Sequence, residues 1–223
     1  MTDKAVEAVV FDVNETLFSL ERLGPAFAEA GLAPALVPLW FARLLRDGFA
    51  LTAMGRFAPF ADLAADALRS LAPDRGDDHA VQVVTAGFRQ LDPHPDVAPA
   101  FEILHTTGVP AVTLTNGGTD LVQHLLQRAG LSGHVQQCLS VAAVRRWKPA
   151  PEPYLYAAEE LGVAPSRLAL VASHPWDCAG AHHAGLRAGW VSRRGEPWPR
   201  VFPTPDVTGA DLPTVVTGLL DHS

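Results

Sequence analysis

The chain has 223 residues, 48% of them hydrophobic and 18% charged, and it carries a formal net charge of −7. This composition supports a packed core and excludes an intrinsically disordered chain. The acidic balance, without a dense cluster of Lys and Arg, excludes nucleic acid as the expected partner. No apolar run reaches the roughly 18 residues that a membrane helix needs, so we expect no membrane partner either.

The N-terminal segment and the two cysteines bear on the cellular compartment. MTDKAVEAVVFDV has no basic region followed by a long apolar stretch, and is typical of a first strand and not of a signal peptide. Cys138 and Cys178 form neither a CxxC pair nor a zinc-ligand spacing, which argues against a disulfide framework. We therefore expect a cytoplasmic protein.

The first 91 residues predict one buried strand followed by a helical region. Residues 8–11 (AVVF) form a short apolar run that ends at Asp12. From residue 17 to residue 91, apolar side chains recur at helical spacing and no strand-like run interrupts them. The segment Pro73–Asp78 (PDRGDD) predicts a loop between two helices, and Gln90–Pro95 returns the chain to the core.

Strands and helices alternate after residue 95, which predicts right-handed βαβ units. We expect an α/β fold: a Rossmann-like, doubly wound parallel sheet formed by residues 1–16 and 92–223, with a helical cap inserted at residues 17–91. The proline-containing tail is expected to be irregular until a last helix near residues 212–220. Three further strands are expected at 109–115, 168–172 and 189–191, and three helices at 121–129, 151–161 and 178–184.

Polar side chains lie where several of these strands end, the place at which doubly wound sheets bind their ligands. They are Asp12, Thr115–Asn116, Lys148 and the segment Ser173–Asp177. A carboxylate such as that of Asp12 can attack an electrophilic carbon or phosphorus and form a covalent ester. The alternative for Asp12 is a turn or helix cap, because Asp often follows a strand in that role.

Four segments, in this order along the chain, resemble the four motifs of the haloacid dehalogenase superfamily. FDVNETLF, with Asp12, is similar to its first motif, hydrophobic-D-x-x-x-T-L, and TNG at Thr115 resembles the second. Lys148 in RRWKPAPEPY resembles the third, and Asp177 in VASHPWD the acidic fourth. The resemblance spans nearly the whole chain and implies a hydrolase with Asp12 as its covalent nucleophile.

Two positions distinguish this chain from the phosphatases of that superfamily. Phosphatases usually carry a second Asp two residues after the nucleophile as general acid; Asn14 stands here, and an amide cannot supply a proton at neutral pH. They also usually carry Gly-Asp where this chain has Ala172-Ser173. Only Asp12 and Asp177 then remain as ligands for a hard cation, which disfavours magnesium. We expect no metal and no cofactor, with magnesium only under a phosphatase alternative.

Further residues resemble those of the type II 2-haloacid dehalogenases. Asn116-Gly117 matches their Asn-Gly, where Asn116 takes the position associated with halide contact. Lys148, with Tyr154 six residues later, matches a Lys and a Tyr of that group, and Trp176-Asp177 matches their Trp-Asp. A halide leaves without a proton, so such an enzyme needs neither the general acid nor the metal.

The resemblance also implies roles. Asp12 attacks the substrate carbon, Lys148 keeps it ionised and oriented, and Asp177 helps to position or activate the hydrolytic water. Thr16 and Thr115 supply hydrogen bonds around the nucleophile or the substrate carboxylate. The expected catalytic residues are Asp12, Lys148, Asp177 and Thr16. The expected substrate-binding residues are Thr115, Asn116, Gly117, Arg43, Tyr154, Ser173, His174 and Trp176.

Some positions depart from the resembled group. The resembled group usually has an Arg that meets the substrate carboxylate or the halide, and Leu51 stands at its position here. Arg43 or Arg46 would then have to point into the cleft instead. The alternative for Arg43 is a solvated side chain. Glu15 replaces a common Gly. His174 stands where Asn is common, and is either an acid or base near neutral pH or a structural residue.

The preferred function is hydrolytic dehalogenation of a small 2-haloalkanoic acid through an aspartyl ester. The first alternative is a magnesium-dependent phosphatase, which Asn14 and Ser173 disfavour. The second is a catalytically silent binding protein, which the set Asp12, Lys148 and Asp177 disfavours. The expected partner is a small anionic substrate, and a homodimer is possible, as dimers are common in the resembled group.

Overall fold

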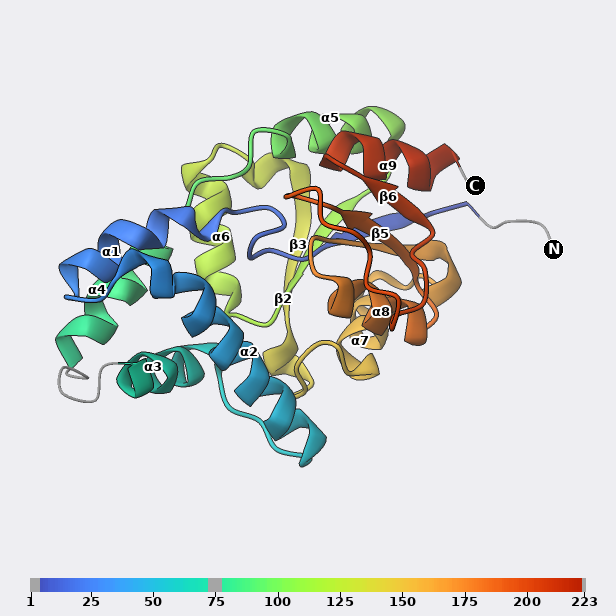
Figure 1. Ribbon diagram of the computed structural model, residues 1–223. Helices are drawn as coiled ribbons and strands as arrows, with labels where there is room; N and C mark the ends of the chain where they lie inside the picture. The colour runs from blue at the N-terminus through green and yellow to red at the C-terminus, as the bar shows by residue number, and fades with distance from the viewer. Residues whose placement is uncertain (1–4, 72–77, 222–223) are drawn as a thin grey trace.

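A parallel sheet forms the centre of the protein (Figure 1). The structure, a computed structural model, describes residues 5–71 and 78–221. Within these residues the strand order is β3-β2-β1-β4-β5-β6, and every neighbouring pair is parallel. This order confirms the doubly wound α/β prediction. The strands are β1 (Ala8–Phe11), β2 (Ala111–Thr115), β3 (Val135–Ser140), β4 (Leu168–Ala172), β5 (Arg187–Val191) and β6 (Val207–Gly209).

Helices cover both faces of the sheet, so the core has two sides. In β1 the side chains alternate: Val9 and Phe11 pack with α5 (Val97–Thr107) and α9 (Leu212–Asp221), whereas Ala8 and Val10 face α7 (Pro151–Leu161) and α8 (Pro175–His183). In Figure 1, α5 and α9 lie above the sheet and α7 and α8 below it. A further helix, α6 (Thr119–Arg128), follows β2. Burial on both faces explains why β1 and β4 are continuous apolar runs.

Within the described residues, four α-helices lie between β1 and α5. They are α1 (Leu23–Glu29), α2 (Val37–Ala53), α3 (Phe60–Leu71) and α4 (Asp78–Phe88). Trp40 of α2 packs among them, with ring centroids 5.6 Å from both Phe27 and Phe88, and its indole N–H donates to Ala64 O at 2.9 Å. The region is helical, as the sequence predicts; its division from the core at residues 17 and 91 stays a prediction. The predicted Pro73–Asp78 loop lies outside the described residues, except that α4 begins at Asp78.

Trp147 joins these helices to the sheet domain. Its side chain is fully buried, its backbone N–H donates to Thr52 Oγ1 and its indole N–H donates to Ala58 O, both at 3.0 Å. The ring of Phe60 stacks on it at 6.0 Å. A Cβ on Gly48 of α2 would lie 2.5 Å from the indole, so only glycine lets α2 approach this closely. The tryptophan next to Lys148 therefore fixes how the helical region sits over the sheet.

The two edge strands of the sheet, β3 and β6, were not predicted from the sequence. An edge strand has one hydrogen-bonded neighbour and partly exposed side chains, so it need not be a continuous apolar run. β3 contains two glutamines in VQQCLS, and β6 has three residues in the tail that was expected to be irregular. The expectation for the tail was therefore wrong at Val207–Gly209. No helix in the described part of the chain is long and apolar enough to cross a bilayer.

Candidate active site

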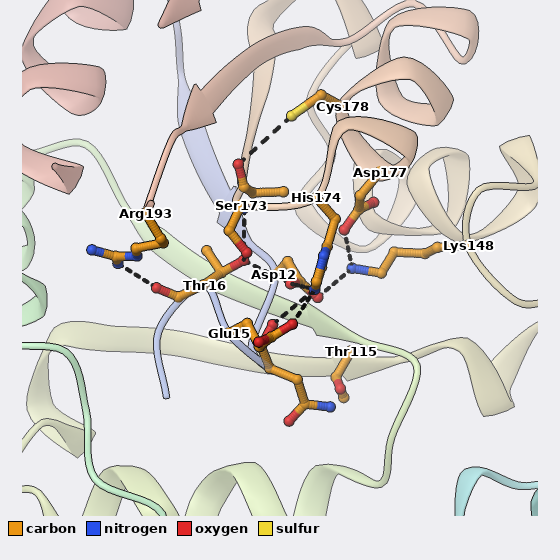
Figure 2. Close-up of polar contacts among 12 residues, drawn as sticks. Asp12, Glu15, Thr16, Thr115, Lys148, Ser173, His174, Asp177, Cys178 and Arg193 are labelled. Carbon is orange, nitrogen blue, oxygen red and sulfur yellow. Dashed lines mark hydrogen bonds and ion pairs between the residues drawn. The ribbon is translucent and has the colours of Figure 1, made fainter. Parts of the chain in front are cut away.

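The site lies where three adjacent strands end. Asp12 follows β1 directly, Thr115 ends β2 on one side, and Ser173 follows β4 on the other. This is the point at which the strand order reverses, where the sheet leaves room for a ligand. Figure 2 shows Asp12, Thr16, Lys148, Ser173, His174 and Asp177 converging there.

Lys148 binds two carboxylates. Its ammonium donates to Asp12 Oδ1 at 2.8 Å, to Asp177 Oδ2 at 2.6 Å and to the carbonyl oxygen of Leu114 at 2.9 Å. The side chain of Lys148 is 0% exposed, and these three acceptors occupy its three hydrogens. The ammonium is therefore fully used in holding the two carboxylates and has no hydrogen left for a ligand.

The two carboxylates are electrostatically unequal. Burial opposes ionisation of Asp12, but the charge of Lys148 outweighs it, aided by His174 and by the hydrogen bond from Thr16, so the pKa of Asp12 lies below its ordinary value. Burial, together with the charge of Asp12, holds the pKa of Asp177 above its ordinary value despite Lys148. Burial disfavours the ammonium of Lys148, yet both carboxylates raise its pKa. Asp12 thus stays ionised, while Asp177 takes up a proton more readily.

Tyr154 of α7 lies beneath Asp177. Its hydroxyl donates to Asp177 Oδ1 at 2.6 Å, and the side chain is fully buried. Burial and the charge of Asp177 hold the pKa of Tyr154 well above its ordinary value, so the phenol keeps its proton and acts as a donor. In the structure Tyr154 orients Asp177, and its expected role in binding the substrate stays a prediction.

Thr16 ties the loop after β1 to the loop after β4. Its hydroxyl donates to Asp12 Oδ2 at 2.7 Å and accepts from the backbone N–H of Ser173 at 2.9 Å. Its carbonyl oxygen accepts from Arg193, which also pairs with Asp96 at 2.6 Å. The orientation of Asp12 thus depends on two loops that are far apart in sequence.

The residues at the end of β2 are also held by hydrogen bonds. Thr115 Oγ1 accepts from the Gly117 N–H at 2.9 Å, and Gly117 O accepts from Ser140 Oγ at 2.6 Å. Asn116 Oδ1 accepts from the backbone N–H of Lys148 at 3.0 Å. Because its oxygen is used in this way, the Asn116 amide is oriented with its NH₂ group as a fixed donor.

Aromatic side chains from α2 cover the β4–α8 side of the site. The His174 ring stacks on Trp176 at 5.1 Å and lies 6.0 Å from the ring of Phe41. Trp176 in turn meets Phe49 edge-on at 4.9 Å. His174 Nε2 lies 4.0 Å from Asp12 Oδ2, so this residue belongs to the surroundings of the carboxylate.

The structure does not bring Arg43 together with the other predicted residues. Arg43 Nη1 donates to Ser70 Oγ at 3.2 Å, at the contact between α2 and α3. Arg46 pairs with its neighbour Asp47 at 2.8 Å and is 67% exposed. A role for Arg43 in binding the substrate anion stays a prediction, and it would require the side chain to leave Ser70.

Three contributors to this site were not predicted from the sequence. Leu114 offers its carbonyl oxygen to Lys148, and Arg193 holds Thr16. Glu15, noted only as a departure from the resembled group, has a left-handed backbone with φ 61° and lies 3.9 Å from His174 Nε2. Only Glu15 had a signal in the sequence, namely a large residue where glycine is common; the others depend on tertiary contacts.

The residues present do not fit a magnesium ion. Across residues 5–71 and 78–221, no group of three or more His, Cys, Asp or Glu side chains is arranged to hold a metal. The ammonium of Lys148 already balances charge on Asp12 and Asp177, which it contacts at 2.8 and 2.6 Å. Asn14 and Ser173 add no charge to the donor set.

The chain belongs to the haloacid dehalogenase-like hydrolases, whose family model matches residues 6–185. Among curated relatives, it is 28% identical to (S)-2-haloacid dehalogenase H-109 of Pseudomonas putida, over 97% of this chain and 99% of the relative. It is 30% identical to the (S)-2-haloacid dehalogenase of Xanthobacter autotrophicus, over 84% of this chain and 76% of the relative. The crystal structure of the L-2-haloacid dehalogenase RSc1362 is similar, with a TM-score of 0.90, 28% identity, and coverage of 97% of this chain and 99% of that one.

Proposed function

We propose that this protein hydrolyses the carbon–halogen bond of a small 2-haloalkanoic acid through an ester on Asp12, without a metal. The observation that carries the proposal is the buried Lys148, which joins Asp12 to Asp177. The relatives named above, which include an (S)-2-haloacid dehalogenase matched over 99% of its length, support the substrate class.

In the first step, Asp12 displaces the halide from the substrate carbon. A carboxylate is a nucleophile only when ionised, and the lowered pKa of Asp12 keeps it so. Asp12 Oδ1 points at the fully buried Lys148, whereas Oδ2 lies on the side of the partly exposed His174. We therefore assign the attack to Oδ2. The halide departs as an anion and needs no proton in this step.

We place the substrate at the β2 and β4 strand ends. Thr115, Asn116 and Ser173 offer hydroxyl and amide donors to the carboxylate and the departing halide, and Gly117 holds Thr115 through its N–H. The amide of Asn116, fixed through its oxygen, is the donor best oriented for this purpose. Trp176 supplies an apolar wall next to them.

In the second step, water attacks the carbonyl carbon of the ester. Lys148 Nζ, 2.8 Å from Oδ1, stabilises the negative charge that develops on that oxygen. Asp177, with its raised pKa and its orientation fixed by Tyr154, accepts a proton from the water. The product is a 2-hydroxy acid, and the carboxylate of Asp12 is restored.

The alternatives are less favoured. A phosphatase would need a general acid where Asn14 stands and an acidic metal ligand where Ser173 stands. A silent binding protein would have no need for a buried ammonium held between two carboxylates, an arrangement that costs desolvation energy.

The test is halide release from the two enantiomers of 2-chloropropionate and from chloroacetate, with and without EDTA, beside a chromogenic phosphate ester. We expect halide release that survives chelation, no phosphate release, and loss of all turnover in Asp12→Asn. Hydrolysis in H₂¹⁸O should place the label on Asp12 after one cycle. Magnesium-dependent phosphate release would establish the phosphatase instead, and inactivity on every substrate would favour the silent protein.

A further inference from the structure

A pocket of about 540 Å³ lies between the helical region and the segment that precedes Lys148. Its lining residues come from the loop between α2 and α3 and from the segment between β3 and the first turn of α7; among them are Gly55, Arg56, Phe57, Arg145, Arg146 and Glu152. None of these residues belongs to the candidate active site. A pocket of this volume is large enough for a small-molecule ligand.

Positive charge is concentrated in this pocket. Three of its lining side chains are arginines and one is a glutamate, which leaves a surplus of two positive charges. The chain as a whole carries a net charge of −7, so the pocket differs in sign from the protein around it. Guanidinium groups gathered in one pocket repel each other, and a bound anion relieves that repulsion.

Arg145 is held in the pocket without a carboxylate partner. Its guanidinium lies 5.2 Å from the centre of the Phe57 ring, a cation–π contact between the two segments. Its backbone is left-handed, with φ 52°, which is unfavourable for residues other than glycine. Within the described residues, Arg145 forms no ion pair. Its charge is therefore fixed in position but not neutralised.

The other two arginines line the pocket from opposite sides. Arg146 Nε lies 3.5 Å from Glu152 Oε1, so its charge is partly balanced. Its Nη2 lies 3.9 Å from where a Cβ on Gly55 would be, which places Arg146 against the α2–α3 loop. Arg56 of that loop is exposed, and no ion pair engages it in the part of the chain that the structure describes. Arg56 and Arg145 are thus available to an anion that enters between the two segments.

The charge and the donors of the pocket define the class of ligand. A guanidinium group donates two parallel hydrogen bonds, a geometry that matches the oxygens of phosphate and carboxylate groups. A phosphate group carries up to two negative charges on one centre, which matches the surplus charge of the pocket. A dicarboxylate of the same charge would spread it over two separate groups.

We propose that this pocket binds a dianionic phosphate group, either as the free ion or as part of a small phosphate monoester. The phosphate is shared between Arg56 from the helical region and Arg145 from the sheet domain. It therefore adds a second link at the contact between these two parts that Trp147 already forms. The proposal does not depend on the proposed dehalogenation.

The experiment is a titration of the full-length protein with inorganic phosphate and with glycerol 3-phosphate at constant ionic strength, measured by calorimetry and thermal unfolding. We expect saturable binding that raises the Tm of the wild type. Arg56→Gln and Arg145→Gln should each weaken binding about ten- to a hundredfold, since each removes charge-assisted hydrogen bonds. Arg200→Gln, at an exposed arginine of the tail, is the matched control and should bind as the wild type does.

The two probes distinguish the sources of the phosphate group: tighter binding of glycerol 3-phosphate identifies a monoester, and equal binding identifies the free ion. Succinate that binds as tightly as phosphate would overturn the ligand class, and unchanged binding in both arginine variants would overturn the site. Binding weakened by Asn116→Ala alone would place the anion in the candidate active site and would also overturn the proposal. These readouts need no dehalogenase activity, so the two proposals fail separately.

Discussion

Lys148 is an ammonium group in the protein interior, with its side chain 0% exposed. Moving such a charge into the protein interior is costly, and the cost is offset here by two carboxylates and a carbonyl oxygen at hydrogen-bonding distance. Removal of this cation would leave Asp12 and Asp177 buried side by side without a counter-ion. At this scale, one side chain supports both the fold and the proposed nucleophile.

The variant Lys148→Met tests both contributions. We expect the free energy of unfolding at neutral pH to fall by about 3–5 kcal/mol, because buried carboxylates lose their partner. We expect chloride release in a single turnover to slow by about a hundred- to a thousandfold. Urea unfolding and quenched kinetics measure the two effects. Asp177→Asn in the same background should recover part of the stability, and a Lys148→Met protein as stable as the wild type would contradict this account.

The opposite pKa shifts of Asp12 and Asp177 predict a pH dependence. Because its pKa is lowered, Asp12 stays ionised at pH values at which an ordinary Asp takes up a proton. Asp177 has a raised pKa and stays protonated at pH values at which an ordinary Asp is ionised. As the pH falls, chloride release in a single turnover should therefore persist after steady-state turnover has declined, and the ester should accumulate. The lowered pKa of Asp12 also means that its ionised form stabilises the folded protein. This stabilisation is present above the unfolded-state pKa and is lost as the pH falls through the folded-state pKa. Coincident acid limbs for both steps would refute the assignment.

At the scale of elements, α2 does more than enclose the site. It contributes Phe41 and Phe49 to the aromatic contacts of His174 and Trp176, and it packs on Trp147 through Gly48. Because Trp147 precedes Lys148 directly, the packing of α2 and the position of the Lys148 ammonium are coupled through one peptide unit.

The variant Gly48→Ala tests this coupling. Alanine usually stabilises a helix relative to glycine, but here the added Cβ would lie 2.5 Å from the Trp147 ring. We expect an overpacking cost of about 1–3 kcal/mol, measured by thermal or urea unfolding, together with a lower kcat. Gly133→Ala is the matched control, since its Cβ would meet nothing within 4 Å. A stabilised and fully active Gly48→Ala protein would show that α2 and Trp147 separate readily.

At the scale of the whole molecule, Arg193 connects segments from both ends of the chain. It follows β5 and binds the carbonyl oxygen of Thr16 and the carboxylate of Asp96. Asp96 also accepts from the backbone N–H of Leu212 at 2.9 Å, where α9 begins. The loop that carries Asp12, the proposed nucleophile, is thus anchored to α5 and α9 on one face of the sheet.

We expect Arg193→Gln to destabilise the protein by about 3 kcal/mol, because Asp96 would remain largely buried without its cation. The kcat should fall as well, since Thr16 loses an anchor and Asp12 depends on Thr16. Arg194→Gln is a neighbouring control at a side chain that is 72% exposed, and should leave stability nearly unchanged. Equal effects of the two substitutions on unfolding would argue against the anchoring role.

The sequence alone determined the doubly wound core, the helical region after the first strand and the convergence of Asp12, Lys148 and Asp177. Buried parallel strands must be continuous apolar runs, and polar residues at their carboxyl ends must meet, so both can be read along the chain. The edge strands β3 and β6 could not be read in this way, since half-exposed strands lack that pattern. Tertiary packing alone decided that Tyr154 supports Asp177, that Arg43 binds Ser70, and that Glu15 faces His174. The direction of a side chain depends on neighbours distant in sequence, which no local pattern records.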